Sequence, residues 1–149
     1  YIPLASVITP NMTEASILLE DRPLKTVDDL KQAAVDLHEL GPEYVLVKGG
    51  RLDGPAVDVL FDGTTITTLE APRIDTDNTS GAGCTYSAAI AANLAKGKSI
   101  KEAVHIAKSF ITTAIAHSFT YTDLVGPTYH AAERKYGEAH EIIIHSEKV

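Results

Sequence analysis

The N-terminal part of the chain joins one short β-prone segment to two helical patterns. Residues 6–9 are rich in β-branched side chains and indicate a strand. In the next segment, 11–20, an Asn and a Glu three residues apart have the spacing of a capping box and predict a helix. Thr26 is a good N-cap for a second helix, whose apolar residues recur on one face until Gly41.

The middle of the chain changes to a β pattern. Residues 44–47 form a continuous apolar run, which is typical of a strand buried on both faces of a parallel sheet. With the preceding strand and helices, this run indicates a βαβ arrangement. Two further β-prone runs, 56–61 and 64–69, are joined by Asp62 and Gly63. This connection predicts a hairpin with a type I′ turn, in which both central residues have positive φ.

The second half of the chain is mainly helical in pattern. A polar loop over 75–80 leads through a glycine-rich turn into a small-residue helix predicted over 85–96. A second capping box begins a helix that keeps its apolar spacing over 99–117. A short helix is predicted over 127–136, and the β-prone residues 142–144 indicate an edge strand. The whole pattern predicts an α/β protein with a parallel core and one antiparallel hairpin.

Composition narrows the class of protein. The chain has 149 residues, which suit one globular domain, and a formal net charge of -7. Because Lys and Arg form no cluster, neither nucleic acid nor an anionic membrane is an expected partner. A single cysteine excludes an internal disulfide and favours a reducing compartment, and no apolar stretch has the length of a membrane span. We therefore expect a cytoplasmic protein.

The first residues of the chain are already apolar, and no initiator Met precedes Tyr1. Folded domains usually begin with a tolerant surface segment. This start is typical of a fragment of a longer protein, although a processed mature terminus is the alternative.

The segment 78–85, with the sequence NTSGAGCT, is the most informative for chemistry. Gly81 and Gly83, separated by Ala82, let the backbone approach a ligand closely, and the following helix presents unpaired N–H groups. Such a turn is an anion hole, suited to a phosphate or to the charge that develops during phosphoryl transfer. The same pattern also fits a tightly packed turn, and it is neither a P-loop nor a dinucleotide-binding pattern.

Cys84 and Lys48 are the side chains best placed to act with such a turn. Cys84 lies at the start of the helix, where the helix dipole favours a thiolate, so it is a candidate base or nucleophile. The alternative is an ordinary small core residue. Lys48 ends an apolar strand, at the sheet edge where ligands bind in open α/β sheets, and it is a candidate phosphate contact. Its alternative is a solvated lysine.

Asn11 and Glu14 have two interpretations. They match a capping box, and they also suit indirect support of Mg²⁺ near nucleotide phosphates. The six histidines show no metal-ligand pattern, and we expect His105 and His117 to be ordinary helix residues.

Three ordered motifs together resemble a known family. They are Thr9-Pro10-Asn11 with Glu14-Ala15, then Val47-Lys48-Gly49-Gly50, then the segment 78–85. Their order and spacing resemble those of the hydroxymethylpyrimidine/phosphomethylpyrimidine kinases and the closely related bacterial pyridoxal (pyridoxine) kinases, in the ribokinase-like superfamily. Val125-Gly126-Pro127 followed by His130 resembles the C-terminal signature of the vitamin B6 kinase branch. The resemblance covers nearly the whole chain, but only the C-terminal half of the family's protein.

The resemblance implies a three-layer α/β/α ribokinase-like sandwich with a mostly parallel sheet and a β-hairpin, of which residues 1–149 are the C-terminal part of a single kinase domain. It also implies ATP- and Mg²⁺-dependent phosphorylation of a hydroxymethyl group, in thiamine biosynthesis or pyridoxal phosphate salvage. The substrate is hydroxymethylpyrimidine, its phosphate, or a B6 vitamer. The resemblance further implies a homodimer of the full-length protein and association of this chain with its own N-terminal half.

By position, the resemblance assigns roles to most of the candidate residues. Gly81, Ala82, Gly83 and Cys84 form the anion hole, and Cys84 takes the place of the aspartate base of other ribokinase-like enzymes. The nucleotide contacts are Lys48, Thr79 and Ser80, with Val104 and Ala107 walling the adenine. Asn11 and Glu14 belong to the Mg²⁺-phosphate environment.

Two departures from the family pattern limit this assignment. Ser80 stands where the family usually has His, and the family's N-terminal half, which supplies most of the substrate pocket, is absent from this sequence. We therefore expect the chain alone to be inactive. The alternatives are a ribokinase-like sugar kinase, against which Cys84 argues, and an inactive nucleotide-binding fragment.

Overall fold

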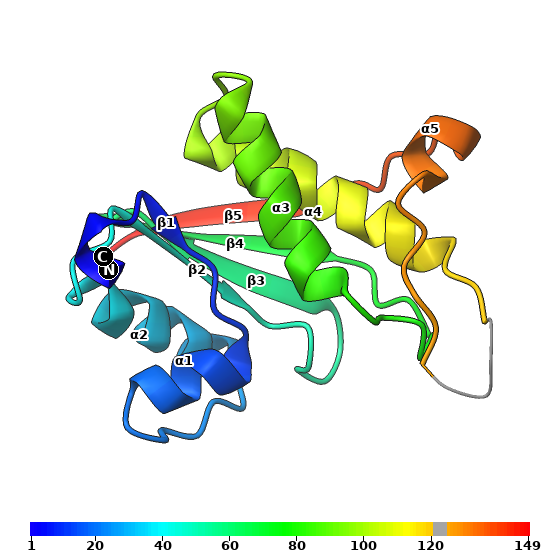
Figure 1. Cartoon of the computed structure of the whole chain (residues 1–149). Coiled ribbons are helices and arrows are strands. Elements are labelled where there is room, and N and C mark those ends of the chain that lie inside the picture. The colour runs from blue at the N-terminus through cyan, green and yellow to red at the C-terminus, as the bar shows by residue number, and fades with distance from the viewer. Residues whose placement is uncertain (121–124) are drawn as a thin grey trace. The chain divides into compact units, whose positions relative to one another are not determined.

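A computed structural model of the chain describes residues 1–120 and 125–149. The chain forms two compact units. The sheet unit comprises residues 1–70 and 143–149, and the helical unit comprises residues 71–142. Figure 1 labels the helices and strands of both units.

The sheet unit holds five strands in the order β1-β2-β3-β4-β5. Its elements in chain order are the 3₁₀ helix η1 (Ile2–Leu4), β1 (Val7–Ile8), α1 (Met12–Leu18), α2 (Val27–His38), β2 (Tyr44–Lys48), β3 (Ala56–Phe61), β4 (Thr65–Ala71) and β5 (Ile143–Lys148). The capping box of α1 forms as predicted, with Asn11 as the N-cap. Thr26 is the predicted N-cap of α2, and it also forms a capping box with Asp29, which was not predicted. The C-terminal edge strand is also confirmed, and it extends further than predicted.

The predicted α/β class is confirmed, but the sheet is mixed rather than mostly parallel. Strands β1 and β2 are parallel and are connected through α1 and α2, which confirms the βαβ arrangement. Strand β2 is antiparallel to β3, and β4 is antiparallel to β5. An unbroken apolar run predicts burial on both faces and says nothing about the direction of the neighbouring strand, so the sequence did not separate these cases.

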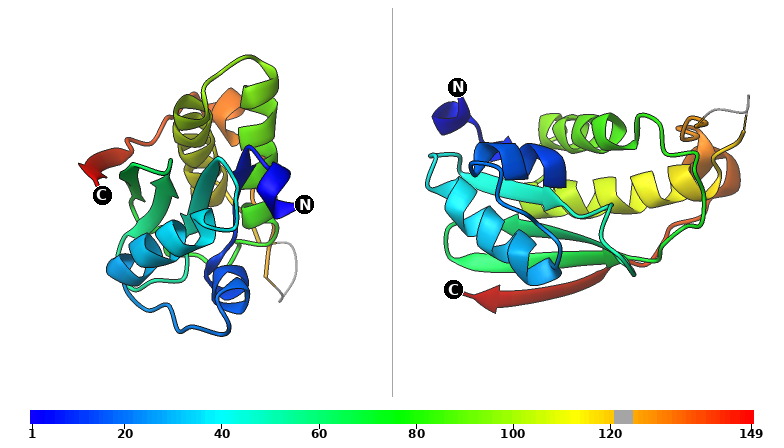
Figure 2. Two further views of the ribbon diagram at one scale, coloured as in Figure 1. Left: turned by 90° about the vertical axis from the view of Figure 1, so that its left-hand side faces the viewer. Right: turned by 90° about the horizontal axis from the view of Figure 1, so that it is seen from below.

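Helices α1 and α2 cover one face of the sheet, as both views in Figure 2 show. Their apolar sides and the facing strand residues form one core cluster, which includes Ala15, Leu30, Leu37, Val45, Val47 and Val59, none of them exposed. Leu46, between the two valines of β2, is also fully buried. The apolar run 44–47 therefore has the burial that its pattern predicts.

The connection between β3 and β4 corrects the predicted turn type. It spans three residues, 62–64, and Gly63 alone in it has positive φ, at 88°. Instead of adopting a positive φ, Asp62 accepts hydrogen bonds on Oδ1 from the N–H groups of Thr64 and Thr65. An aspartate that bonds to the backbone two residues ahead forms an Asx turn, which competes with the type I′ geometry.

The helical unit contains α3 (Ala82–Ala95), α4 (Ile100–Ala116) and α5 (Ala132–Tyr136). Helices α3 and α4 lie side by side (Figure 2). Helix α3 begins three residues earlier than predicted, because Gly81 is its N-cap and Ala82 continues directly into the helix. Helix α5 begins five residues later than predicted, since Pro127 forms a bridge with Ser80 instead of starting a helix.

Among the described residues, no helix has the length and apolar character to cross a membrane.

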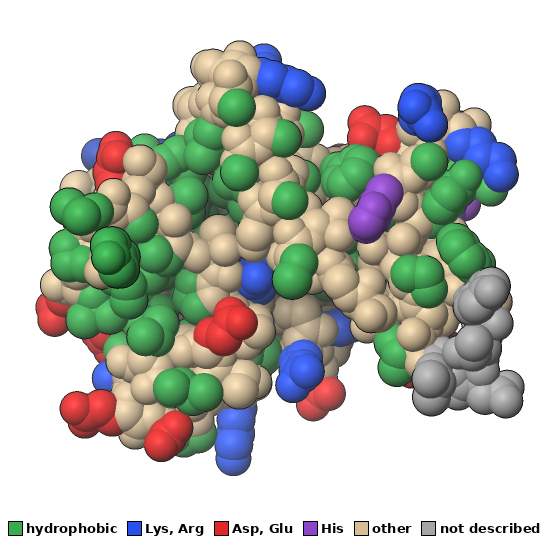
Figure 3. All heavy atoms as spheres, viewed as in Figure 1, with side chains coloured by type: hydrophobic (Ala, Val, Ile, Leu, Met, Phe, Trp, Pro, Cys, Tyr) green, Lys and Arg blue, Asp and Glu red, His purple; other side chains and the backbone are tan. Residues whose placement is uncertain are grey.

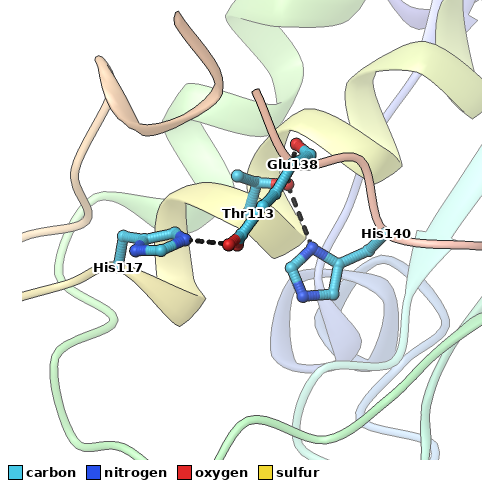
Figure 4. A network of polar contacts seen from close by, with 4 residues as sticks. All are labelled: Thr113, His117, Glu138 and His140. Atoms are coloured by element: carbon cyan, nitrogen blue, oxygen red, sulfur yellow. Dashed lines mark hydrogen bonds and ion pairs between the residues drawn. The ribbon is translucent and has the colours of Figure 1, made fainter. Parts of the chain in front are cut away.

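A polar network fastens the segment after α5 to α4 (Figure 4). His117 Nε2 lies 2.7 Å from Glu138 Oε2, and the His117 ring stacks on Tyr136 at 4.0 Å. Thr113 Oγ1 lies 3.0 Å from His140 Nδ1 and also donates to the Glu138 carbonyl. His117 therefore differs from the ordinary helix residue that was expected, because it binds Glu138 and stacks on Tyr136.

Candidate functional site

The glycine-rich turn of the helical unit directly starts helix α3. Gly81 has a φ of 78°, a left-handed conformation that favours glycine, and it is the N-cap of the helix. The Ala82 N–H donates to the Thr79 carbonyl at 3.1 Å, and the Thr85 N–H donates to the Gly81 carbonyl at 2.9 Å. These bonds fold residues 79–85 into one tight turn that leads into the helix.

Helix α3 begins differently from α1, α2 and α4. Helices α1, α2 and α4 each begin with a complete capping box, in which side chains take up first-turn N–H groups. Helix α3 has no side-chain cap among the described residues. The N–H groups of Gly83 and Cys84, in its first turn, therefore have neither a cap nor an intrahelical acceptor, and they carry the positive end of the helix dipole. This arrangement suits an anion.

Cys84 is the third residue of α3, and its thiol is free and exposed. Cys84 lies within the first turn of the helix, and not in the loop before it. Its thiol is therefore close to the backbone N–H groups of Gly83 and of Cys84 itself. Thr79 and Ser80 are exposed on the turn that leads to it. The structure thus brings the predicted residues 79–84 together at one helix N-terminus and does not bury Cys84 as a core residue.

Three further residues hold this turn and were not assigned roles from the sequence. The Gly126 N–H donates to Asn78 Oδ1 at 2.8 Å, and Thr85 Oγ1 lies 2.9 Å from His130 Nε2. These contacts join residues 45 or 48 positions apart. Asn78, Gly126 and His130 all lie in motifs that carry the family resemblance, and that was the only sequence signal for them.

A second cluster of predicted residues lies in the sheet unit, where β1 and β2 end. The Lys48 N–H donates to the Pro10 carbonyl at 2.9 Å, and Asn11 forms a parallel bridge with Lys48. Glu14 Oε2 accepts the Asn11 N–H at 2.8 Å, and Asn11 Oδ1 accepts the Glu14 N–H at 2.9 Å. Asn11, Glu14 and Lys48 are therefore neighbours, and the capping interpretation of the first two is confirmed.

The backbone after Lys48 is fixed by a buried carboxylate that sequence reasoning missed. Asp58 lies directly opposite Lys48 on β3, is 2% exposed, and accepts the Gly49 N–H at 2.9 Å. A Cβ atom at Gly49 would overlap the Val57 carbonyl oxygen and approach a Leu30 methyl group. Only glycine therefore fits at this position after Lys48.

Asn11 and Glu14 are exposed and suit a magnesium ion that is bound through water and phosphate oxygens. No group of three or more His, Cys, Asp or Glu side chains in the described part of the chain is arranged to hold a metal ion. Glu14 uses only Oε2 in the capping box, which leaves its other carboxylate oxygen outside that bond pair. Mg²⁺ commonly keeps several waters and binds through one or two carboxylates together with substrate phosphates. Asn11 and Glu14 fit that mode, and a dedicated protein cage is not present among the described residues.

Val104 and Ala107, predicted to wall an adenine, are fully buried on α4. Their assignment stays a prediction. Ile106 and Phe110 on the same helix line an open groove of about 580 Å³ within the helical unit, which Thr85, His130 and Glu133 also line.

Comparison with known proteins gives consistent matches. A family described as phosphomethylpyrimidine kinase matches residues 1–129. The pyridoxine kinase of Bacillus subtilis is 54% identical over 134 residues, which are 89% of this chain and 49% of that protein. The hydroxymethylpyrimidine/phosphomethylpyrimidine kinase of Streptomyces coelicolor is 43% identical over 129 residues, which are 87% of this chain and 48% of that protein.

A solved structure extends the match to the fold. The pyridoxal kinase from Staphylococcus aureus in complex with AMP-PCP superimposes with a TM-score of 0.94 at 37% identity. The match covers 98% of this chain and 54% of that one. The chain thus spans about half the length of the curated relatives it matches.

Proposed function

The chain belongs to the phosphomethylpyrimidine kinase family, and on that premise we propose that it is part of an ATP-dependent kinase of small heteroaromatic alcohols. The acceptor is a hydroxymethyl group on hydroxymethylpyrimidine, on its phosphate, or on a B6 vitamer such as pyridoxine or pyridoxal. The relatives that support this substrate class include enzymes named for both ring types. The reaction serves thiamine biosynthesis or pyridoxal phosphate salvage.

The observation that carries the proposal is the uncapped first turn of α3. Gly81 adopts positive φ, the amides of Gly83 and Cys84 have no side-chain cap, and the Cys84 thiol is exposed beside them. Preorganised N–H groups that point at a transferring phosphoryl group stabilise the charge that develops in the transition state. Removing one such donor typically costs about 10²–10³ in rate.

Cys84 occupies the place of the acceptor-side base in this proposal. As a thiolate it would take the proton from the substrate hydroxyl, while phosphoryl transfer itself depends mainly on positioning and electrostatics. A sugar kinase of the same superfamily uses an aspartate here to deprotonate an aliphatic alcohol, so Cys84 favours the heteroaromatic acceptors.

The remaining candidate residues hold the nucleotide. Lys48 supplies a positive charge to the phosphates, and Asp58 fixes the backbone beside it. Thr79 and Ser80 lie exposed beside the phosphate-binding turn. Asn11 and Glu14 would contact the waters and phosphates around Mg²⁺. When bound, the ion would offset part of the negative charge of the phosphates.

We also propose that both units are parts of one kinase domain that is completed by an N-terminal half. Strand β1 has β2 as its one neighbour in the described sheet. Hydrophobic side chains gather around the N-terminal segment of the sheet unit (Figure 3), where Tyr1 and Leu4 are each more than 80% exposed. An open strand edge beside exposed apolar side chains is a surface that a further strand and helix can cover.

Two expectations about the whole protein follow from the same proposal. The exposed Cys84 thiol must stay reduced to act as a base, which supports a cytoplasmic location. The homodimer that the family resemblance implies is tested by light scattering of the intact protein.

The test of the proposed function is an acceptor panel. The intact protein is incubated with ATP and Mg²⁺ and, in turn, with hydroxymethylpyrimidine, its phosphate, pyridoxine, pyridoxal or ribose. Formation of ADP and of the phosphorylated product is measured for each. Turnover with at least one heteroaromatic alcohol and none with ribose is expected. Turnover with ribose alone would establish the sugar-kinase alternative, and ATP binding without turnover would establish the nucleotide-binding one.

A further inference from the structure

The first turn of α3 is held from both sides by one segment, Gly126–His130. Before the turn, the Gly126 N–H donates to Asn78 Oδ1, and the Ser80 N–H donates to the Gly126 carbonyl at 3.2 Å. After the turn, His130 Nε2 lies 2.9 Å from Thr85 Oγ1. The segment therefore contacts the chain on either side of the amides at Gly83 and Cys84.

The segment is itself fixed to the helical unit. The Tyr129 N–H donates to the Ala114 carbonyl of α4 at 2.9 Å. The Tyr129 ring makes edge contacts with Phe119 at 6.0 Å and with Tyr136 at 6.4 Å. Because Tyr129 precedes His130 directly, these contacts hold the backbone beside His130, whose imidazole contacts Thr85 of α3.

Helix α3 needs such an outside contact more than the helices that begin with a capping box. In α1, α2 and α4 the capping side chains order the first turn by taking up its N–H groups. A capping side chain at α3 would order the turn in the same way, but it would also occupy the amides that an anion needs. Gly83 within the turn further lowers the intrinsic stability of the helix start. A hydrogen bond to the Thr85 side chain orders the turn and leaves the amides open.

We propose that His130 is a positioning residue for phosphoryl transfer, acting through Thr85 on the first turn of α3. The proposal rests on the proposed function for the role of that turn. His130 has no assigned contact with a reacting group. Its effect reaches the site because Cys84 is the residue immediately before Thr85. Either tautomer of a neutral imidazole serves, since a threonine hydroxyl both donates and accepts.

A different role for His130 makes a different kinetic prediction. His130 also lines the groove with Phe110 and Glu133. If its role were to form a wall of a ligand site there, removing the imidazole would raise KM for the ligand. A positioning residue changes the geometry of the transition state, so its removal lowers kcat and leaves KM nearly unchanged.

The test is a double-mutant cycle in the intact protein. The variants are His130→Ala, Thr85→Val and the double variant, with His130→Gln as the conservative replacement and His105→Ala as the control. His105 is an exposed histidine of α4 outside this contact. For each variant, kcat and the KM values for ATP and acceptor are measured, together with amide hydrogen exchange of a peptide that spans residues 81–87.

Each single variant should lower kcat about tenfold with KM values within about twofold, and the double variant should be no worse than either single one. His130→Gln should recover part of kcat, His105→Ala should match the wild type, and exchange over 81–87 should be faster in the three variants that break the contact. Additive losses, an unchanged kcat, or a rise in KM alone would overturn the proposal. If the wild type phosphorylates no acceptor, the proposed function fails, and the exchange measurement still decides the contact: unchanged exchange over 81–87 overturns it.

Discussion

Gly126 and Asn78 are joined across 48 positions of the chain by one hydrogen bond of 2.8 Å, from the glycine N–H to the asparagine side-chain oxygen. Asn78 Nδ2 in turn donates to Thr120 Oγ1 at 3.1 Å, so this amide group, which precedes α3, binds two positions that both follow α4. The glycine-rich turn therefore depends on residues far away in the sequence.

Gly126→Ala should destabilise the helical unit, although its backbone does not need positive φ. A Cβ atom at Gly126 would overlap Asn78 Oδ1 and the Phe119 carbonyl oxygen, so the segment must shift. We expect a loss of about 1–3 kcal/mol in the free energy of unfolding, as for other overpacked sites. Urea denaturation measures it. Gly50→Ala is the control for stability, because nothing lies within 4 Å of a Cβ atom there.

Lys48→Ala should weaken the use of ATP and leave stability nearly unchanged. The substitution removes a point charge from the phosphate path without affecting the backbone hydrogen bond to Pro10. Lys48→Arg should not restore activity fully, because a planar guanidinium fits a different geometry. Steady-state kinetics with varied ATP measure the effect, with the exposed Lys25→Ala as the control. Wild-type kcat/KM for ATP in Lys48→Ala would make Lys48 an ordinary solvated lysine.

Asp36→Asn should change how stability depends on pH. The hydrogen bond from Arg22 holds the pKa of Asp36 below its usual value, with a further hydrogen bond from Gln32 acting the same way. A lowered pKa contributes stability that is present above the ordinary value and is lost as the pH falls through the lowered one.

The expected loss in Asp36→Asn at pH 7 is about 0.5–1 kcal/mol, since both side chains are partly exposed, and it should shrink as the pH falls below about 4. Denaturant unfolding between these pH values measures it, and Asp53→Asn, at an exposed position outside this pair, should show no such trend. A loss that stays constant down to the lowest pH would contradict the assigned cause.

Cys84→Ala should lower kcat by at least about tenfold, or about 1.4 kcal/mol of transition-state stabilisation, without a comparable fall in Tm. Cys84→Asp restores the usual base of the superfamily beside the same amides, and we expect it to retain more activity than Cys84→Ala. Equal kcat values for the wild type and Cys84→Ala would remove the base role while leaving the family assignment intact.

Local patterns predicted most of the fold. The N-caps Asn11, Thr26 and Ser99 mark helix starts because a cap is a contact within four residues. The antiparallel pairing of β2 with β3 was not predicted, since the burial of Val45, Leu46 and Val47 is the same beside a parallel or an antiparallel neighbour.

The site was predicted where its geometry is local and missed where it is not. The turn around Gly81 and the exposed Cys84 follow from a short motif. Asp58 beside Gly49 and His130 beside Thr85 are contacts between elements, which no spacing along the chain indicates. The start of α3 was placed too late, because a glycine N-cap gives no side-chain signal.

Binding of the nucleotide phosphates at the first turn of α3 is tested most directly by the alkylation rate of Cys84. The intact protein is treated with iodoacetamide with and without ATP and Mg²⁺, and the peptide that contains Cys84 is followed by mass spectrometry. With nucleotide at about ten times its Kd, we predict alkylation about tenfold slower, in proportion to the unoccupied fraction. An unchanged rate, with nucleotide binding shown separately by calorimetry, would contradict the account.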